Sequence, residues 1–238
     1  MIDDNGTYIG EELQLFAAAK NWKAYLAAQM APFFGPRVLE VGAGMGTTTA
    51  ALCKGGEREW VCLEPDIRLL AEVDKRLAAG ELPACCRPRA GTLADFADDD
   101  LFDTILYVDV LEHIENDREE AALAFRHLAP GGHLVVLSPA HPFLYTPFDK
   151  AIGHYRRYTK KSLAAISPAG ARRARWRYLD AAGFFASLAN RLMLSQSMPT
   201  ARQLWVWDRL MVPLSRFLDP LFFFAFGKSV LGVWRRDA

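Results

Sequence analysis

The chain contains 238 residues, of which 51% are hydrophobic, and its 28 basic residues balance 28 acidic ones. This length and apolar content suffice for one α/β domain with a sizeable core. A formal net charge of zero gives no overall field that would attract nucleic acid, so we expect no nucleic-acid partner. No apolar stretch reaches the roughly 18 residues that span a bilayer, and the acidic N-terminus does not resemble a signal peptide. These features favour a cytoplasmic protein.

The four cysteines show no spacing that is typical of a metal site. They are Cys53, Cys62, Cys85 and Cys86. Adjacent cysteines such as Cys85 and Cys86 make a poor disulfide pair. The sequence therefore predicts reduced thiols and no metal.

Apolar strands alternate with helix-prone segments from residue 37 to residue 138, which favours a doubly wound sheet. A helix over residues 11–34 precedes them and ends at Gly35-Pro36. The expected strands are Arg37–Val41, Glu59–Leu63, Ala84–Arg89, Phe102–Val108, His133–Ser138, Arg173–Tyr178 and Lys228–Arg236, and the expected helices between the first five are Thr48–Leu52, Asp66–Ala79 and Glu115–Leu128. The helix-prone, aromatic stretch Ala181–Phe226 separates the last two strands as a helical insertion.

The first strand runs into a glycine-rich turn with the pattern E-x-G-x-G-x-G, from Glu40 to Gly46. Glycines at alternate positions leave no side chain between the backbone and a ligand. A turn of this kind between a strand and a helix is where open α/β sheets bind nucleotide-like ligands. The dinucleotide fingerprint G-x-G-x-x-G would need a third glycine at Thr47. The pattern instead resembles motif I of the class I S-adenosylmethionine-dependent methyltransferases.

The resemblance extends over roughly residues 38–158 and implies a Rossmann-like, doubly wound, seven-stranded sheet with an N-terminal helix and a helical insertion before the last strand. It also implies S-adenosylmethionine as the cofactor. One domain over residues 1–238 would comprise a helical segment (1–36), a cofactor-binding core (37–178), an insertion or lid (179–227) and a closing strand (228–238). The cofactor-binding residues that the resemblance implies are Glu40, Gly42, Ala43, Gly44, Gly46, Thr47, Glu64, Pro65, Thr92, Leu93, Asp109 and Val110.

Three of these positions carry distinct expectations. Glu40 matches the acid that lies near the amino group of the methionine part in the family. Glu64 ends the second strand, where a carboxylate accepts hydrogen bonds from ribose hydroxyls, although a solvated acid at a strand end is the alternative. Many family members have an acid where this sequence has Thr92, so we expect backbone groups near Thr92 and Leu93 to contact adenine.

The segment Asp109–Ile114 closes the fourth strand and resembles the "VLEH" element of small-molecule methyltransferases. Either Asp109 or His113 faces the methyl-transfer centre, or Glu112 and His113 only tie a loop to the sheet. Both interpretations remain open at this point.

A long loop over residues 139–159 contains a G-H-x-R-R-Y element at residues 153–158 that resembles a subset of these enzymes. The loop follows the carboxyl end of a strand, where a substrate must approach. We expect substrate contacts from Tyr145, Arg156, Arg157 and Tyr158. The alternative is a loop that is held by ion pairs, for instance between Asp149 and either arginine.

Two further segments leave alternatives open. Arg173, Arg175 and Arg177 share one face of the expected sixth strand, either as an exposed face or as a contact for an anionic substrate or membrane. The aromatic stretch near the C-terminus, residues 204–226, forms core, a lid over the substrate, or a helix in peripheral membrane contact.

The sequence thus predicts a methyltransferase that acts on a small-molecule acceptor, with oxygen (sugar, phenol or carboxylate) as our hypothesis. A hydroxyl acceptor needs a base, and the candidates in descending order are His141, His113 and His154. The alternatives are an NAD-dependent oxidoreductase and a non-catalytic binding protein with the same fold. The sequence does not indicate an oligomeric state.

Overall fold

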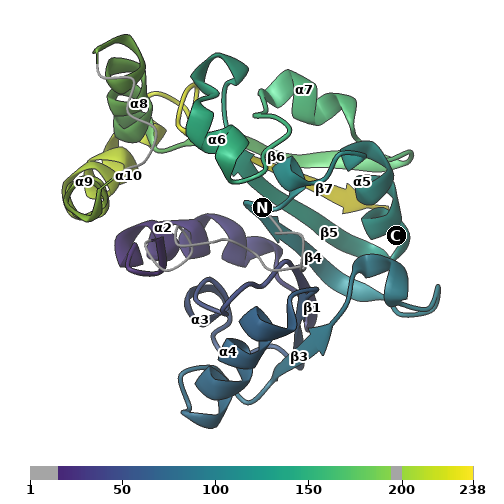
Figure 1. The fold of residues 1–238 in the computed structure, drawn as a ribbon. Helices are drawn as coiled ribbons and strands as arrows, with labels where there is room; N and C mark the ends of the chain where they lie inside the picture. The colour runs from purple at the N-terminus through teal and green to yellow at the C-terminus, as the bar shows by residue number, and fades with distance from the viewer. Residues whose placement is uncertain (1–15, 194–199, 238) are drawn as a thin grey trace.

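The computed structural model describes residues 16–193 and 200–237, and its centre is a seven-stranded sheet with the strand order β3-β2-β1-β4-β5-β7-β6 (Figure 1). Strands β1 to β5 pair in parallel, and β7 runs antiparallel to both β5 and β6. The carboxyl ends of β1 to β6 therefore meet at one edge. The strands are β1 (Arg37–Val41), β2 (Glu59–Glu64), β3 (Cys86–Ala90), β4 (Phe102–Val108), β5 (Leu128–Pro139), β6 (Ala171–Leu179) and β7 (Ser229–Arg236). The predicted fold class is confirmed.

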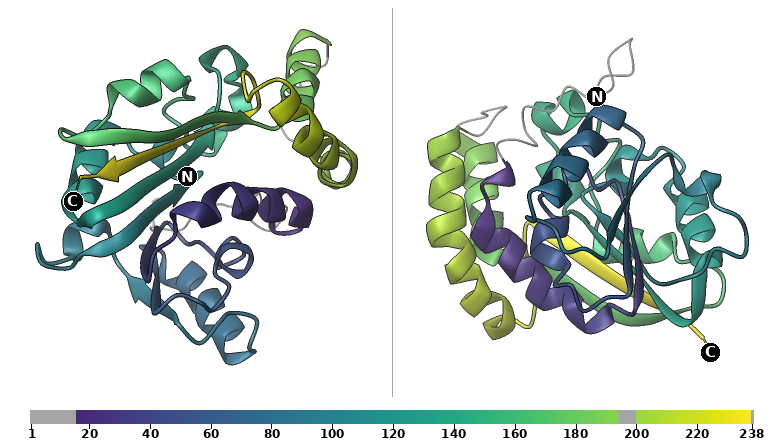
Figure 2. Two further views of the ribbon diagram at one scale, coloured as in Figure 1. Left: turned by 180° about the vertical axis from the view of Figure 1, so that it is seen from behind. Right: turned by 90° about the horizontal axis from the view of Figure 1, so that it is seen from below.

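Helices cover both faces of the sheet because buried side chains alternate along the strands (Figure 2). Leu106 of β4 belongs to a core on one face, and its neighbours Ile105 and Tyr107 belong to a core on the other. The first face carries α2 (Lys20–Met30), α3 (Thr49–Leu52), α4 (Ile67–Ala78) and the insertion, and the second carries α5 (Asp117–Arg126) and α7 (Lys160–Ala165).

The predicted helical insertion consists of α8 (Ala181–Met193), α9 (Ala201–Val206), a π-helical turn (Trp207–Met211) and α10 (Val212–Leu221). It packs against α2, as Figures 1 and 2 show. Two buried carboxylates join these elements: Asp208 accepts the backbone N–H of Trp22 at 2.9 Å, and Asp219 accepts the hydroxyl of Tyr25 at 2.7 Å. Among the described residues, every helix is too short or too polar to cross a membrane.

Several expected boundaries differ from the structure. The N-terminal helical segment is not continuous: Phe16 and Ala17 are helical, the helix is interrupted at Ala18 and Ala19, and α2 begins at Lys20. Residues 11–15 lie outside the described part, and a 3-10 turn (Ala31–Phe33) follows α2. Strand β5 covers Leu128–Pro139 and so begins five residues before the expected start at His133. The long loop contains a 3-10 turn (Pro142–Leu144) and the short helix α6 (Pro147–Ala151).

The prediction that three arginines share one face of β6 is wrong, because the β6–β7 pairing shifts register between Arg173 and Arg175. A bulge of this kind reverses which side chains point to a given face. Arg175 and Arg177 donate to Gln29 of α2 at 3.0 and 2.6 Å. Arg173 instead lines a small cavity on the opposite face beside Trp176.

Candidate cofactor and acceptor site

The turn after β1 follows a path that requires glycine. Gly42, Gly44 and Gly46 have φ angles of 71°, 56° and 71°, which side chains disfavour. A Cβ atom at Gly42 would lie 2.6 Å from a methyl carbon of Val110. The turn therefore passes directly beside the end of β4 and presents backbone, not side chains, at the edge of the sheet.

Glu64 connects this turn to the end of β2. Its carboxylate accepts the backbone N–H of Gly44 at 2.8 Å and that of Asp66 at 3.0 Å. The residue is 7% exposed, and burial raises the pKa of its carboxyl. These bonds fix the carboxylate beside the glycine turn, and each oxygen keeps a second lone pair for a further donor.

Glu40 lies inside the core beneath the turn. Its Oε2 atom accepts hydrogen bonds from the Thr49 hydroxyl and the Trp60 indole N–H, both at 2.8 Å. Burial raises the pKa of this carboxyl to about 7. The described contacts of Glu40 are thus internal and join β1 to α3 and β2, whereas we expected the acid to lie near a ligand amino group. Lys23 of α2, whose charge favours the ionised form of Glu40, was missed because a lysine on a helix usually reaches solvent.

Three strands that end at this edge are followed by residues in the left-handed region. Asp109, His141 and Asp180 have φ angles of 55°, 65° and 69°, after β4, β5 and β6 respectively. In residues other than glycine, this backbone conformation costs on the order of 1 kcal/mol or more. Residues that adopt it are concentrated at functional sites. The Asp109 side chain is exposed at this edge, but neighbouring protein displaces part of its hydration. This desolvation raises the pKa of the carboxyl to about 6.

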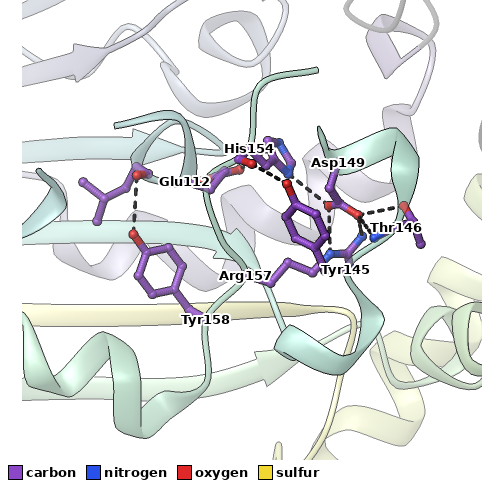
Figure 3. Close-up of polar contacts among 8 residues, drawn as sticks. Glu112, Tyr145, Thr146, Asp149, His154, Arg157 and Tyr158 are labelled. Atoms are coloured by element: carbon purple, nitrogen blue, oxygen red, sulfur yellow. Dashed lines mark hydrogen bonds and ion pairs between the residues drawn. The ribbon is translucent and has the colours of Figure 1, made fainter. Parts of the chain in front are cut away.

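A buried carboxylate organises the loop after β5 (Figure 3). Asp149, which is 1% exposed, accepts hydrogen bonds from Nε and Nη2 of Arg157, at 2.8 and 2.9 Å. It lies 3.0 Å from Nδ1 of His154 and also accepts the Thr146 hydroxyl at 2.8 Å. Burial alone would raise the pKa of Asp149, but these hydrogen bonds outweigh it and hold the pKa well below its usual range.

The other side of the His154 ring faces the end of β4. Its Nε2 atom is 3.8 Å from Oε1 of Glu112, which is fully buried, and the His113 ring lies 4.5 Å away, edge to face. Burial raises the pKa of Glu112 well above its ordinary value and lowers that of His113 to about 4. The three residues offer ligand atoms within 4.8 Å of one another, so the network has the donor types of a divalent-cation site.

Comparisons with known proteins show which family and which fold the chain resembles. Residues 39–134 match the model of a methyltransferase domain family. The demethylmenaquinone methyltransferase of Tropheryma whipplei (strain Twist) is 28% identical over 161 residues, which are 63% of this chain and 61% of that protein. The N-methyltransferase NodS from Bradyrhizobium japonicum WM9, solved with S-adenosyl-L-homocysteine, superposes with a TM-score of 0.60 at 14% identity, over 99% of this chain and 94% of that one. Residues 39–134 therefore match a methyltransferase domain, and the chain as a whole has the fold of S-adenosylmethionine-dependent methyltransferases.

The match to relatives is partial. The demethylmenaquinone methyltransferase of Clavibacter sepedonicus is 30% identical over 131 residues, which are 54% of this chain and 52% of that protein. The chain spans about three fifths of the length of the Tropheryma relative.

The remaining expected cofactor residues of the methyltransferase domain lie around the same edge. Ala43 donates its backbone N–H to Leu63, and Thr47 and Pro65 flank the turn and the end of β2. Thr92 is exposed, but its N–H and hydroxyl both donate to Asp95. The Leu93 side chain is buried in the core, so any cofactor contact there would come from its backbone. These assignments stay predictions.

The expected substrate residues largely have internal partners. Tyr158 is 2% exposed and donates its hydroxyl to Asp117 at 2.6 Å, and Arg156 forms an ion pair with the same carboxylate at 2.6 Å. Tyr145 donates to the backbone carbonyl of His154. Together with the Arg157–Asp149 pair, these contacts correspond to the alternative of a loop held by ion pairs. Tyr158 is buried with an internal partner, and its expected role as a substrate contact stays a prediction.

His141, the first candidate for a base, lies apart from the carboxylate network. Its ring stacks on Tyr178 at 4.7 Å and lies 5.0 Å from the ring of Phe184. Its Nε2 atom is buried without a hydrogen-bond partner among the described residues, and burial lowers the pKa of the imidazole. Nδ1 of His154, by contrast, contacts the Asp149 carboxylate, a distinction that a sequence pattern does not contain.

Proposed function

We propose that the methyltransferase domain transfers the methyl group of S-adenosylmethionine to an oxygen atom of a small-molecule acceptor. The observation that carries the acceptor side is the contact between the Asp149 carboxylate and Nδ1 of His154. Bound S-adenosylmethionine would supply an electrophilic methyl group on a sulfonium that needs little help to leave. The protein therefore has two tasks, to align the acceptor and to remove its proton.

The residues at the edge of the sheet suit this cofactor. The glycine turn offers backbone that a Cβ atom would obstruct, as the short distance between Gly42 and Val110 indicates. Glu64 is held beside it with lone pairs that can accept ribose hydroxyls. We infer that the turn and Glu64 hold the cofactor, with Asp109 and Val110 beside it.

The proton of the acceptor would go to His154. When Nδ1–H of His154 donates to Asp149, Nε2 carries no proton and can accept one. The negative charge of Asp149 then stabilises the imidazolium that forms, as in hydrolase triads. Burial lowers the pKa of His113 to about 4, which makes it a weaker base than an ordinary imidazole. We therefore rank His154 before His113 and His141, which reverses the order from the sequence.

The comparisons favour this function over the NAD-dependent oxidoreductase, because residues 39–134 match a methyltransferase model. The organised Asp149–His154 pair favours it over a non-catalytic binding protein. A carboxylate acceptor would need no base, so the base variants below also separate acceptor types.

The test supplies S-adenosylmethionine labelled with ¹³C in the methyl group to the full chain together with a low-molecular-weight cell extract. The ¹³C chemical shift of the product separates methyl groups on oxygen, nitrogen and carbon. We expect an O-methyl product and a fall in kcat of about 10²- to 10⁴-fold in His154→Asn with unchanged S-adenosylhomocysteine binding. His133→Asn is the control, because His133 lies within β5 and packs on Phe33, away from this network. An N- or C-methyl product would refute oxygen as the acceptor, and full turnover in His154→Asn would refute the base.

We further propose that the insertion contacts an anionic membrane surface. Its exposed apolar side chains are Phe185, Trp205, Leu210, Leu214, Phe217, Leu221, Phe222 and Phe223. Between residues 200 and 227 the exposed charges are all arginines (Arg202, Arg209 and Arg216), whereas Asp208 and Asp219 are buried. An apolar face with arginines and no exposed acid complements anionic lipid.

Sedimentation with vesicles tests this contact. We expect binding to vesicles that contain phosphatidylglycerol and much weaker binding to phosphatidylcholine alone. Phe217→Asp should abolish binding, and Ile67→Asp, which changes an equally exposed apolar residue on α4, should not. Equal binding of wild type and Phe217→Asp would exclude the membrane contact.

A further inference from the structure

Three of the four cysteines converge on one point, although no spacing in the sequence indicates it. Cys53 ends α3, and Cys85 and Cys86 lie at the start of β3. The Sγ atom of Cys53 is 3.5 Å from that of Cys85 and 3.8 Å from that of Cys86. All three sulfur atoms lie within 4.8 Å of one another. Parallel pairing brings the loops before β2 and β3 together at the amino edge of the sheet, away from the cofactor turn.

A carboxylate lies beside one member of the group. Oε2 of Glu57 lies 3.5 Å from Sγ of Cys53 and accepts the backbone N–H of Gly55, which orients it toward the thiols. Cys53 and Cys86 are buried and Cys85 is partly exposed, so the group has an entry path from solvent.

The distances fit a tetrahedral zinc ion. With Zn–S bonds of about 2.3 Å, two sulfur ligands of a tetrahedron lie about 3.8 Å apart, and a sulfur and a carboxylate oxygen about 3.6 Å apart. The Cys53 sulfur lies 3.5 and 3.8 Å from the other two sulfurs and 3.5 Å from the Glu57 oxygen. The sulfurs of Cys85 and Cys86 lie within 4.8 Å of each other. Thiolate ligands select soft or borderline metals, of which zinc is the common one in proteins without redox chemistry.

We propose that Cys53, Cys85 and Cys86 form a structural zinc site that joins the loop after α3 to β3, and that the Glu57 carboxylate, which already contacts Cys53, turns in as the fourth ligand. Four protein ligands leave no open position, so the ion has a structural role and not a catalytic one. Binding converts the thiols to thiolates and releases their protons to solvent. Because α3 follows the glycine turn, the ion would also stabilise the far end of the helix that begins at the cofactor turn.

The first test measures the zinc content of the full chain, purified with a reductant, by mass spectrometry of the metal. We expect about one zinc per chain, and replacement by Co²⁺ should give thiolate-to-cobalt charge-transfer bands and the strong visible bands of tetrahedral cobalt. Mass spectrometry of the intact protein gives a second readout. A chain without metal, or with a Cys53–Cys85 disulfide as isolated, would overturn the proposal.

Variants separate ligation from folding. Glu57→Gln, at a partly exposed position, should keep the fold and lower zinc affinity about tenfold or more. Cys85→Ser should lose the cobalt bands. Glu72→Gln is the control, because it changes a partly exposed carboxylate on α4 that pairs with Lys75. Unchanged zinc affinity in both Glu57→Gln and Cys85→Ser would show that these residues are not ligands.

Discussion

Nδ1 of His154 lies 3.0 Å from Oδ1 of Asp149, and the same carboxylate holds the guanidinium of Arg157 through two hydrogen bonds. One buried acid therefore positions the proposed base and fixes the loop that carries it. The position of His154 depends on the ion pair between Asp149 and Arg157, which lie on either side of it in the chain, rather than on its own helix or strand. We therefore expect a substitution that breaks this ion pair to lower both the stability of the loop and the rate of methyl transfer.

Asp149→Asn should lower both stability and turnover. The amide keeps one acceptor oxygen but leaves the Arg157 charge without its partner, and breaking a buried pair from one side costs about 3–5 kcal/mol. We expect a lower free energy of unfolding in urea and a kcat at least tenfold lower. Asp98→Asn, at an exposed position, should change neither. Wild-type stability in Asp149→Asn would show that the ion pair contributes nothing to the loop.

Gly42→Ala should weaken cofactor binding, and Gly80→Ala is a closely matched control. Both glycines have a φ angle of 71°, so each substitution carries the same backbone strain. At Gly42 the new methyl group would also meet Val110 at 2.6 Å, whereas nothing lies within 4 Å of it at Gly80. Binding of S-adenosylhomocysteine should fall at least tenfold in Gly42→Ala only. An equal loss in both variants would mean that strain, and not the position of the turn, controls the affinity.

Tyr158→Phe distinguishes a structural from a substrate role. The hydroxyl of Tyr158 is buried on Asp117, so its removal should cost about 1–2 kcal/mol of stability. A residue that only holds the loop should leave KM for the acceptor unchanged, whereas a substrate contact should raise it. Tyr155→Phe, at a 54% exposed position, is the control for stability. A raised KM with unchanged stability would restore the substrate role.

The sequence predicts the sheet well because strand periodicity and the glycine turn are local signals. The bulge on β6 is not local: it depends on pairing with β7, so the side on which Arg173 points could not be predicted. The internal role of Tyr158 likewise depends on Asp117, 41 residues away. The choice among three histidines depends on which of them contacts a carboxylate, and the thiol group depends on two loops that meet only in the fold.

Glu40 should make stability depend on pH. Its pKa is about 7 in the folded protein and 4.5 ordinarily, so the unfolded chain ionises first as the pH rises. Below pH 4.5 the titration of Glu40 does not change the free energy of unfolding. Between pH 4.5 and 7 it lowers that free energy increasingly, and above pH 7 the loss levels off at about 3 kcal/mol. Glu40→Gln should remove this dependence. Parallel pH profiles of unfolding free energy for the two proteins would contradict the raised pKa.

The most direct test of the account is a calorimetric titration of the full chain with S-adenosylhomocysteine, with NAD as the parallel ligand. The glycine turn and Glu64 predict micromolar binding of S-adenosylhomocysteine, no binding of NAD, and loss of binding in Gly44→Val, since Gly44 has a φ angle of 56° and donates to Glu64. Binding of NAD alone, or equal binding of S-adenosylhomocysteine to wild type and Gly44→Val, would contradict it.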